Sequence, residues 1–215
     1  MVITKSFNNL DADKQKRILN AALKEFSENG YDKASTNRIV KEAGIGKGML
    51  FYYFKNKEEL YYYLINYAVD MMTNEYFSLI DMKEPDFIER LKKSVQVKIA
   101  FYADNPHVNN FLGALFLTDK LELSADLETR FEEMQRLGFS ILYADIDHSL
   151  FREDIDVDKA FQLIRWSIEG YQNELINKFK GQKVTSIDMD PVLEEFDEYL
   201  NIFKTSFYKQ EGDTQ

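Results

Sequence analysis

The residues best suited to binding chemistry lie between positions 35 and 57, where hydroxyl, amide, lysine and aromatic side chains are concentrated. Ser35 and Thr36 precede a short apolar helical pattern, and the turn at Gly44 separates this pattern from a second one that begins at Lys47. Two short helices joined by a tight glycine turn are typical of a helix-turn-helix, whose second helix enters the major groove of DNA. There a lysine donates to guanine O6 and N7 or to a phosphate, and both interpretations stay open for Lys47.

The sequence offers little for catalysis or metal binding. It contains no cysteine, no glycine-rich phosphate loop and no G-x-S-x-G segment, which excludes thiolate zinc sites and the common nucleophile motifs. Its two histidines, His107 and His148, stand alone without the spacing of an H-E-x-x-H site. We therefore expect no catalytic residue, no metal and no cofactor.

Apolar residues recur at helical spacing along nearly the whole chain, and no stretch alternates as a strand would. Only three prolines and nine glycines interrupt the 215 residues, which favours long helices. The pattern predicts an all-α fold, with an N-terminal three-helix head and a C-terminal helical bundle, about nine helices in all. We expect the helices at 11–29, 35–43, 46–53, 56–72, 86–103, 111–117, 124–148, 157–179 and 190–207.

Charge is unevenly distributed along the chain. The first 60 residues carry a net charge of +3, whereas residues 61–215 carry −13 and bring the whole chain to −10. A basic head suits DNA, because each phosphate that lysine or arginine neutralises releases counterions. The alternative is that the acidic residues simply keep the surface solvated. No apolar run reaches the roughly 18–20 residues of a membrane span, and no signal peptide is recognisable, so we expect a cytoplasmic protein without a membrane partner.

The C-terminal bundle offers candidates for a dimer surface. The helix expected at 157–179 has apolar residues on two faces, so it must bury one face inside the chain and the other against a partner. Gly170 lies within it, where glycine costs about 1 kcal/mol relative to alanine unless a close helix approach uses it. The expected dimer surface comprises Ile164, Ile168, Gly170, Leu175, Phe196, Leu200 and Phe203.

Aromatic side chains of the same bundle are candidates for a ligand pocket, although each could equally belong to the core. They suit an apolar or aromatic small molecule, and the acidic body would favour a cationic one. The expected pocket comprises Tyr67, Phe101, Phe111, Phe116, Tyr143, Trp166 and Tyr171.

The N-terminal region resembles the DNA-binding domain of TetR-family repressors, from residue 11 to about residue 60. An Ala-Gly-Ile turn, a Leu-aromatic-x-Tyr-Phe run and the sequence Lys-Asn-Lys-Glu occur together at the spacing of that family. The resemblance implies an all-helical homodimer with an N-terminal DNA reader and a C-terminal domain that holds an inducer. The segments that carry it are Ile18-x-x-Ala21-Ala22-x-x-x-Phe26-x-x-x-Gly30-Tyr31, Ser35-Thr36-x-x-Ile39-Val40 and Ala43-Gly44-Ile45-Gly46-Lys47-Gly48-Met49-Leu50-Phe51-Tyr52-Tyr53-Phe54-Lys55-Asn56-Lys57-Glu58-Glu59-Leu60.

The resemblance also implies which side chains contact DNA. Thr36 and Lys57 take positions that hold phosphates at helix N-termini, and Lys47 faces the bases and the backbone. Tyr52 and Tyr53 take positions that bond phosphates and stack on sugars or thymine methyl groups. The full set implied for DNA binding is Ser35, Thr36, Asn37, Lys47, Gly48, Met49, Tyr52, Tyr53 and Lys57.

Two positions depart from the family pattern. Phe51 stands where the family often has a tyrosine that contacts phosphate, and Gly46 replaces the common serine cap of the third helix. Either change would weaken binding or shift contacts to Tyr52 and Lys55, without removing the fold.

The sequence thus predicts a sequence-specific DNA-binding transcription regulator, expected to be a repressor that a small molecule releases from a palindromic operator. A homodimer fits this role, because paired heads read half-sites roughly 34–36 Å apart. The alternatives are an architectural DNA-binding protein without an inducer and an enzyme. The expected domains are 1–56 for DNA binding, with the motif at 35–54, and 57–209 for ligand binding and dimerisation, followed by a disordered tail at 210–215.

Overall fold

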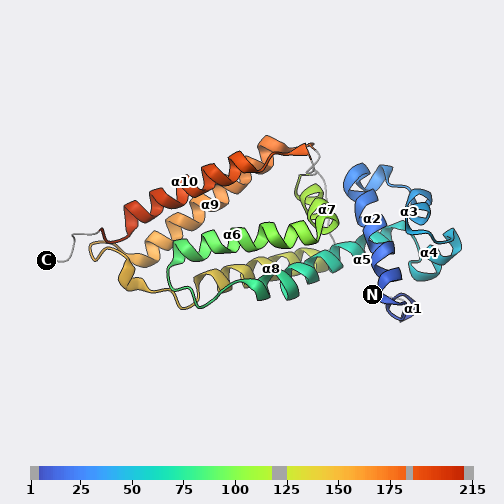
Figure 1. Ribbon diagram of the computed structural model, residues 1–215, viewed down its shortest axis with the longest axis horizontal. Helices are drawn as coiled ribbons and strands as arrows, with labels where there is room; N and C mark the ends of the chain where they lie inside the picture. Colours follow the sequence, from blue (N-terminus) through green and yellow to red (C-terminus); the bar gives the residue numbers. More distant parts are fainter. Residues whose placement is uncertain (1–4, 118–124, 183–185, 211–215) are drawn as a thin grey trace.

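The computed structural model describes residues 5–117, 125–182 and 186–210, and it confirms the prediction of an all-α fold. Within these residues the β-structure is limited to one isolated antiparallel bridge between Phe151 and Tyr208. The molecule is elongated, with the N-terminal helices gathered at one end and the others running along its length (Figure 1). No helix in these ranges is long and apolar enough to cross a membrane.

Four helices form the head, and local residue types explain where they begin and end. The Asp11 carboxylate caps α2 by accepting from the backbone N–H of Lys14 at 2.8 Å. Gly30, with φ of 67°, breaks α2 before its last residues, and Gly44, with φ of 66°, ends α3 in the left-handed conformation. The four are α1 (Lys5–Asn8), α2 (Ala12–Lys33), α3 (Thr36–Ala43) and α4 (Lys47–Tyr53).

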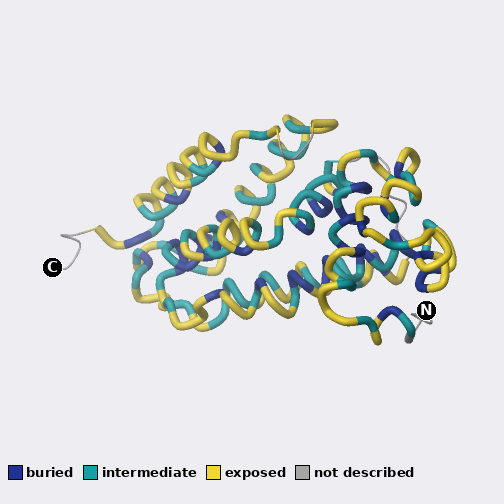
Figure 2. The backbone as a smooth tube through the Cα atoms, turned by 45° about the vertical axis from the view of Figure 1, so that its right-hand side comes forward, coloured by how far each residue is buried: buried dark blue, intermediate teal, exposed yellow. Residues whose placement is uncertain are grey.

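Aromatic rings dominate the core of the head. Phe7 of α1, a turn that the sequence patterns did not predict, is fully buried, and its ring centroid lies 4.9 Å from Phe54 and 5.5 Å from Tyr63. Ile18 of α2 and Ile39 of α3 are also fully buried. Buried and exposed positions alternate along these helices (Figure 2), and the buried ones belong to a core that continues into the body.

The helix α5 (Lys57–Asp70) leads from the head into the body. Asn56 caps it by accepting from the backbone N–H of Glu59 at 2.7 Å. The Glu59 carboxylate returns to the backbone N–H of Lys55 at 2.7 Å, one residue before the cap position that a capping box would use. The chain continues through a π-helix, η1 (Met71–Tyr76), and a short 3₁₀ turn, η2 (Phe77–Leu79).

In the body, α6 runs between α5 and α8 on one side and the pair α9–α10 on the other (Figure 1). The helix α7 packs against α2 and so joins the body to the head. One hydrophobic core extends from the head along α5 and α7, and a second fills the far end between α6, α9 and α10. The body helices are α6 (Phe87–Asp104), α7 (Pro106–Phe116), α8 (Ala125–Tyr143), α9 (Val157–Phe179) and α10 (Asp190–Phe207).

Two helix boundaries differ from the prediction. The helix α7 begins at Pro106 rather than at 111, because the fixed φ of proline suits the first helical position. The helix α8 ends at Tyr143 rather than near 148, and Asp145, with φ of 53°, turns the chain away. The tail expected at 210–215 lies outside the described residues, except for Gln210, which is exposed.

A buried arginine holds the end of α8. Arg90 is 1% exposed, and its guanidinium donates to the backbone carbonyls of Ala144 at 2.5 Å and Glu84 at 2.6 Å. It also reaches the carbonyls of Ile141 and Leu142, which α8 leaves without helical partners. Burial lowers the pKa of Arg90, and these carbonyls compensate its charge in place of water.

Candidate nucleic-acid interface

The helices α3 and α4 are held in a fixed relation by a short turn and a buried contact. Gly44 takes the left-handed conformation that the turn needs, and the backbone N–H of Ile45 donates to the carbonyl of Val40 at 3.0 Å. Ile39 of α3 and Leu50 of α4 are 0% and 1% exposed, so each helix is anchored in the core by one side. The opposite side of each helix is left to the solvent.

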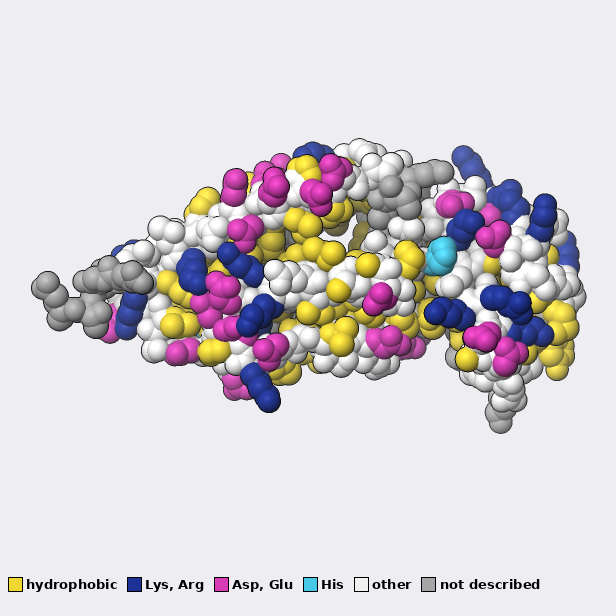
Figure 3. Space-filling model, in the orientation of Figure 1, with side chains coloured by type: hydrophobic (Ala, Val, Ile, Leu, Met, Phe, Trp, Pro, Cys, Tyr) yellow, Lys and Arg dark blue, Asp and Glu magenta, His cyan; other side chains and the backbone are white. Residues whose placement is uncertain are grey.

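The outer side of α4 carries the exposed residues expected to read DNA. Met49 is 40% exposed and Tyr52 is 65% exposed, and Lys47 and Gly48 are exposed beside them. No hydrogen bond or ion pair within the described ranges engages the Lys47 ammonium. Figure 3 shows lysine and arginine side chains spread over this end of the molecule. The surface is therefore available to a partner rich in phosphates.

Tyr53 is buried beneath this surface, and its DNA contact stays a prediction. It is 2% exposed, and its ring centroid lies 5.8 Å from that of Phe7 in an edge-on arrangement. Adjacent side chains on a helix point about 100° apart, so Tyr52 faces the solvent while Tyr53 faces the core. Phe51 is 37% exposed and stays at the edge of the surface.

The Lys57 ammonium is engaged within the head. It donates to the backbone carbonyls of Tyr31 at 2.7 Å, Asp32 at 3.2 Å and Ala34 at 3.4 Å. It lies 4.6 Å from the centroid of the Tyr31 ring. Lys57 thus ties the end of α2 to the start of α5, and its phosphate contact stays a prediction.

The start of α3 is fixed by a carboxylate that the sequence patterns did not single out. Glu25, 7% exposed, accepts from the backbone N–H of Ser35 at 2.8 Å and from the Arg38 guanidinium at 2.6 Å. Burial favours its neutral form, but these hydrogen bonds and the charge of Arg38 together lower the pKa of Glu25. Thr36 and Asn37 are the first two residues of α3, the helix that precedes α4. Thr36 is partly exposed and Asn37 is exposed.

The residues expected to form a ligand pocket divide between the two cores and the surface. Phe111, 1% exposed, packs edge-on against Tyr61 in the core nearest the head. Trp166 is 59% exposed on α9, and Tyr171 donates to the Glu195 carboxylate of α10 at 2.9 Å.

Among the remaining members, Phe101 and Tyr67 share the core of Phe111, whereas Tyr143 packs against the other core. Tyr143 lies against Phe87 in the far core, and burial raises its pKa to about 12. Phe101 is buried beside Tyr76, Phe116 is 48% exposed, and Tyr67 is half-buried on α5. Most of these residues belong to a packed core, and the ligand pocket stays a prediction.

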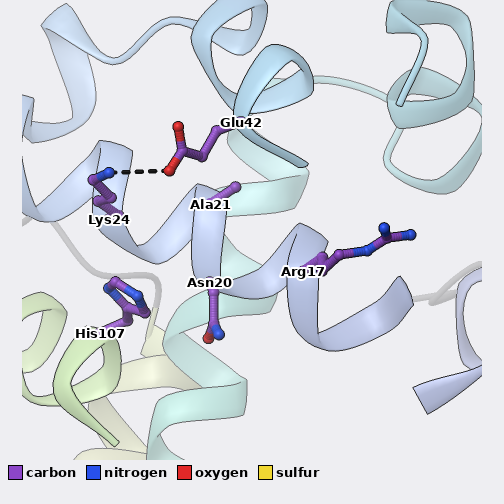
Figure 4. A pocket seen from close by; sticks show the side chains of 6 residues that line it. All are labelled: Arg17, Asn20, Ala21, Lys24, Glu42 and His107. Atoms are coloured by element: carbon purple, nitrogen blue, oxygen red, sulfur yellow. Dashed lines mark hydrogen bonds and ion pairs between the residues drawn. The ribbon is translucent and has the colours of Figure 1, made fainter. Parts of the chain in front are cut away.

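A cleft of about 210 Å³ lies where the head meets the body. In Figure 4, His107 of α7 lies across from Asn20 and Lys24 of α2, and Lys24 pairs with Glu42 of α3 at 3.0 Å. The described residues hold no cluster of three or more side chains suited to a metal ion. The cleft is lined by Arg17, Asn20, Ala21, Lys24, Glu42 and His107, none of which was predicted as a site residue.

The residues expected at a dimer surface differ in their burial, and the surface stays a prediction. Ile164 and Leu200 are 0% and 1% exposed, because both face the far core of their own chain. Ile168, Phe196 and Phe203 pack partly against that core too, and Leu175 is half-buried. The exposed apolar side chains of α9 and α10 are instead Leu163, Trp166, Tyr199 and Ile202, and a Cβ at the exposed Gly170 would meet nothing within 4 Å.

Two family models match the chain. The model described as bacterial regulatory proteins of the tetR family matches residues 18–64, and the model described as a tetracyclin repressor-like C-terminal domain matches residues 85–207. An HTH-type transcriptional regulator of Staphylococcus aureus (strain USA300) is 28% identical over 174 residues, which cover 77% of this chain and 91% of that protein.

Solved structures share the fold. A TetR family transcriptional regulator from Chloroflexus aurantiacus J-10-fl has a TM-score of 0.61 at 24% identity, covering 96% of this chain and 99% of that one. A transcriptional regulator FadR from Bacillus subtilis in complex with stearoyl-CoA has a TM-score of 0.52 at 20% identity, covering 88% and 97%. Because the C-terminal model alone spans more than half of the chain and the N-terminal model covers the helix-turn-helix, the chain belongs to the TetR family of bacterial regulatory proteins and is a DNA-binding transcriptional regulator.

Proposed function

We propose that the protein is a homodimeric repressor that binds a palindromic DNA operator through α3 and α4, and that a small molecule bound in its helical body releases it. The observation that carries the proposal is the outer side of α4. There Lys47, Met49 and Tyr52 are exposed on a helix that Leu50 anchors in the core. A lysine and an aromatic ring on a rigid helix suit contacts with base edges, phosphates and sugars in a major groove.

A dimer is supported by the outer face of α9 and α10. Leu163, Trp166, Tyr199 and Ile202 are between 40% and 59% exposed, and large apolar side chains grouped on one face are typical of an interface. The open space around Gly170 would let a partner helix approach closely. A two-fold axis through this face would present two heads to two half-sites of a palindrome.

Release by a ligand requires that the body can move the head. The helix α7 packs on α2, and α5 runs from the head into the body. Arg130 of α8 donates to Asp70 of α5 at 2.6 Å and also binds Asn66. A ligand that prefers one packing of α7 and α8 would thereby prefer one spacing of the heads, which is a population shift between two dimer geometries.

The domain division and the cellular setting complete the proposal. We assign residues 1–56 to DNA binding and 57–209 to ligand binding and dimerisation, with α5 as the connection. We place the protein in the cytoplasm, where its DNA target is accessible, and assign it no enzymatic activity. The second candidate, an architectural DNA-binding protein, would use the same exposed α4 surface without reading sequence.

The test is selection of bound duplexes from a random pool by the full-length protein. The matched control is the double variant Lys47→Met/Tyr52→Ala, whose two exposed positions leave the packed core unchanged. We expect the wild type to enrich a palindrome with half-site centres about 10–10.5 base pairs or a multiple apart, and the variant to enrich nothing. Tight binding without enrichment would favour the architectural protein and overturn the proposal, as would an enriched site that lacks two-fold symmetry.

A further inference from the structure

The Arg38 side chain of α3 is held from behind by a nearly buried carboxylate of α2. The side chain of Glu25 is 8% exposed, whereas that of Arg38 is 55% exposed. The Arg38 Nε lies 3.0 Å from both carboxylate oxygens of Glu25, and Nη2 lies 2.6 Å from Oε1. Because one partner is fixed inside the protein and the other reaches the solvent, the pair holds a guanidinium in one orientation at the surface.

These contacts use only part of the guanidinium. Arginine carries N–H groups on Nε, Nη1 and Nη2 in one rigid plane. Besides its bond to Glu25, Nη2 donates to the backbone carbonyl of Lys33 at 2.9 Å. Among the residues that the structure describes, no acceptor takes a hydrogen bond from Nη1. Donors that are free, on a plane that the bonds at Nε and Nη2 fix, are suited to an anion from outside the chain.

The position of Arg38 in α3 favours a phosphate over a base edge as that anion. Arg38 is the third residue of α3 and follows Thr36 and Asn37 in its first turn. Ile39, the next residue, is fully buried and anchors the helix in the core. In a helix-turn-helix the first helix crosses the phosphate backbone, while the second enters the major groove. An exposed cation in the first turn of α3 is therefore on the helix that meets phosphates.

A second ion pair between the same two helices provides a contrast. Lys24 of α2 pairs with Glu42 of α3 at 3.0 Å, but both side chains are exposed, by 41% and 59%. Lys24 lies on the side of α2 that faces His107 of α7 in the body (Figure 4). An ion pair between two exposed, flexible side chains fixes little geometry. The nearly buried partner thus distinguishes Arg38 from Lys24.

Resting on the proposed binding of DNA through α3 and α4, we propose that Arg38 binds a backbone phosphate through Nη1, and that Glu25 is a positioning residue that holds the guanidinium in the binding orientation. Neither residue belongs to the set that the family resemblance implies for DNA binding. An oriented side chain loses little conformational freedom when the phosphate arrives, which favours the contact over one from a mobile lysine. The contact carries no sequence information, since every base pair has the same phosphates.

The phosphate contact is tested by DNA affinity at several salt concentrations, on the selected palindrome and on a random-sequence duplex of equal length. Arg38→Met should weaken binding to both duplexes about tenfold or more and reduce the slope of log K against log salt by about 0.9 for each head. Arg38→Lys keeps the charge but lacks the planar fork, so it should keep the slope and weaken binding less. The matched control, Lys24→Met, removes another paired cation of the head and should bind both duplexes as the wild type does.

The positioning role of Glu25 is tested by a double-mutant cycle on the same affinities. Glu25→Gln should weaken DNA binding about twofold or more in the wild-type protein and leave binding by Arg38→Met unchanged, as expected for two residues that act together. A merely structural role would weaken binding equally in both proteins. Circular dichroism at the titration temperature checks that each variant is folded. The exposed Arg38 variants test the phosphate contact even if Glu25→Gln unfolds the head.

Three results would overturn the inference. Arg38→Met could leave the salt slope unchanged, or it could weaken binding to the palindrome alone, which would mean that Arg38 reads a base. Glu25→Gln could strengthen binding, which would mean that the carboxylate masks the cation. Each of these is compatible with selection of a palindrome, in which case the regulator stands and the contact is wrong. If Arg38→Met reduces the slope on the random duplex but the wild type selects no palindrome, the contact stands and the proposed function fails.

Discussion

Replacing Lys57 by methionine separates a structural role from a DNA contact. The structure places the Lys57 ammonium on the backbone carbonyls of Tyr31, Asp32 and Ala34, where it joins the end of α2 to the start of α5. The resemblance to TetR repressors places the same residue on a phosphate. These two roles predict opposite outcomes for stability and for the salt dependence of DNA binding.

The cost to stability can be worked from the contacts. Hydrogen bonds to a charged donor contribute about 1.5–3 kcal/mol, and an ammonium over an exposed aromatic ring adds about 0.5–1 kcal/mol. Methionine keeps the apolar stem but leaves the carbonyl of the buried Ala34 without this donor. We expect a loss of about 2 kcal/mol, which corresponds to a fall in Tm of about 4–8 °C for a chain of this size.

The assay is thermal unfolding together with DNA affinity at several salt concentrations. Lys57→Met should lower Tm and leave the slope of log K against log salt unchanged. The control Lys47→Met should keep Tm and reduce the slope by about 0.9 for each head, or about 1.8 for a dimer. An unchanged Tm for Lys57→Met, with a slope reduced by about 1.8, would refute the structural role and restore the phosphate contact.

Four further predictions follow from individual side chains. Gly48→Ala should stabilise the head by up to about 1 kcal/mol, because the added Cβ meets nothing within 4 Å, yet weaken binding in a gel-shift titration if DNA approaches the backbone there. The pKa of Glu25 is lower in the folded chain than its ordinary value of 4.5, so its ionised form stabilises the fold above pH 4.5 and this stabilisation is lost as the pH falls through the folded pKa. Glu25→Gln should therefore lower the free energy of unfolding in urea at pH 7 and make it depend less on pH below about 4.5. Arg90→Met should cost on the order of 3 kcal/mol in urea unfolding, because buried carbonyls lose their donor, and a loss under 1 kcal/mol would contradict that role. Trp166→Glu should yield monomers in sedimentation without lowering helix content, whereas a stable dimer would exclude the outer face of α9 as the interface.

The head was predictable where local residue types decide the structure. Gly30 and Gly44 end helices because their positive φ is costly for other residues, and Asn56 caps α5 through its own side chain. Each of these effects acts within a few residues. The order of helices and the all-α fold follow from the same local patterns.

The site was less predictable where the partner is distant in sequence. Lys57 contacts carbonyls 23 to 26 residues away, and Tyr53 packs on Phe7, which belongs to a turn that no apolar stripe marks. Periodicity showed that α9 has two apolar faces, but only packing shows that Ile164 faces inward and Trp166 outward.

The most direct test of the central claim is the affinity and stoichiometry of the full-length protein on the selected palindrome and on a duplex that carries one half-site. Native mass measurement counts the protomers, and anisotropy gives the two affinities at one fixed salt concentration. A dimeric reader predicts two protomers on the palindrome and binding to the single half-site that is weaker by about 100-fold or more, because only one head then contacts its specific bases. Equal affinity for both duplexes, or one protomer on the palindrome, would contradict the account of paired heads reading DNA through α3 and α4.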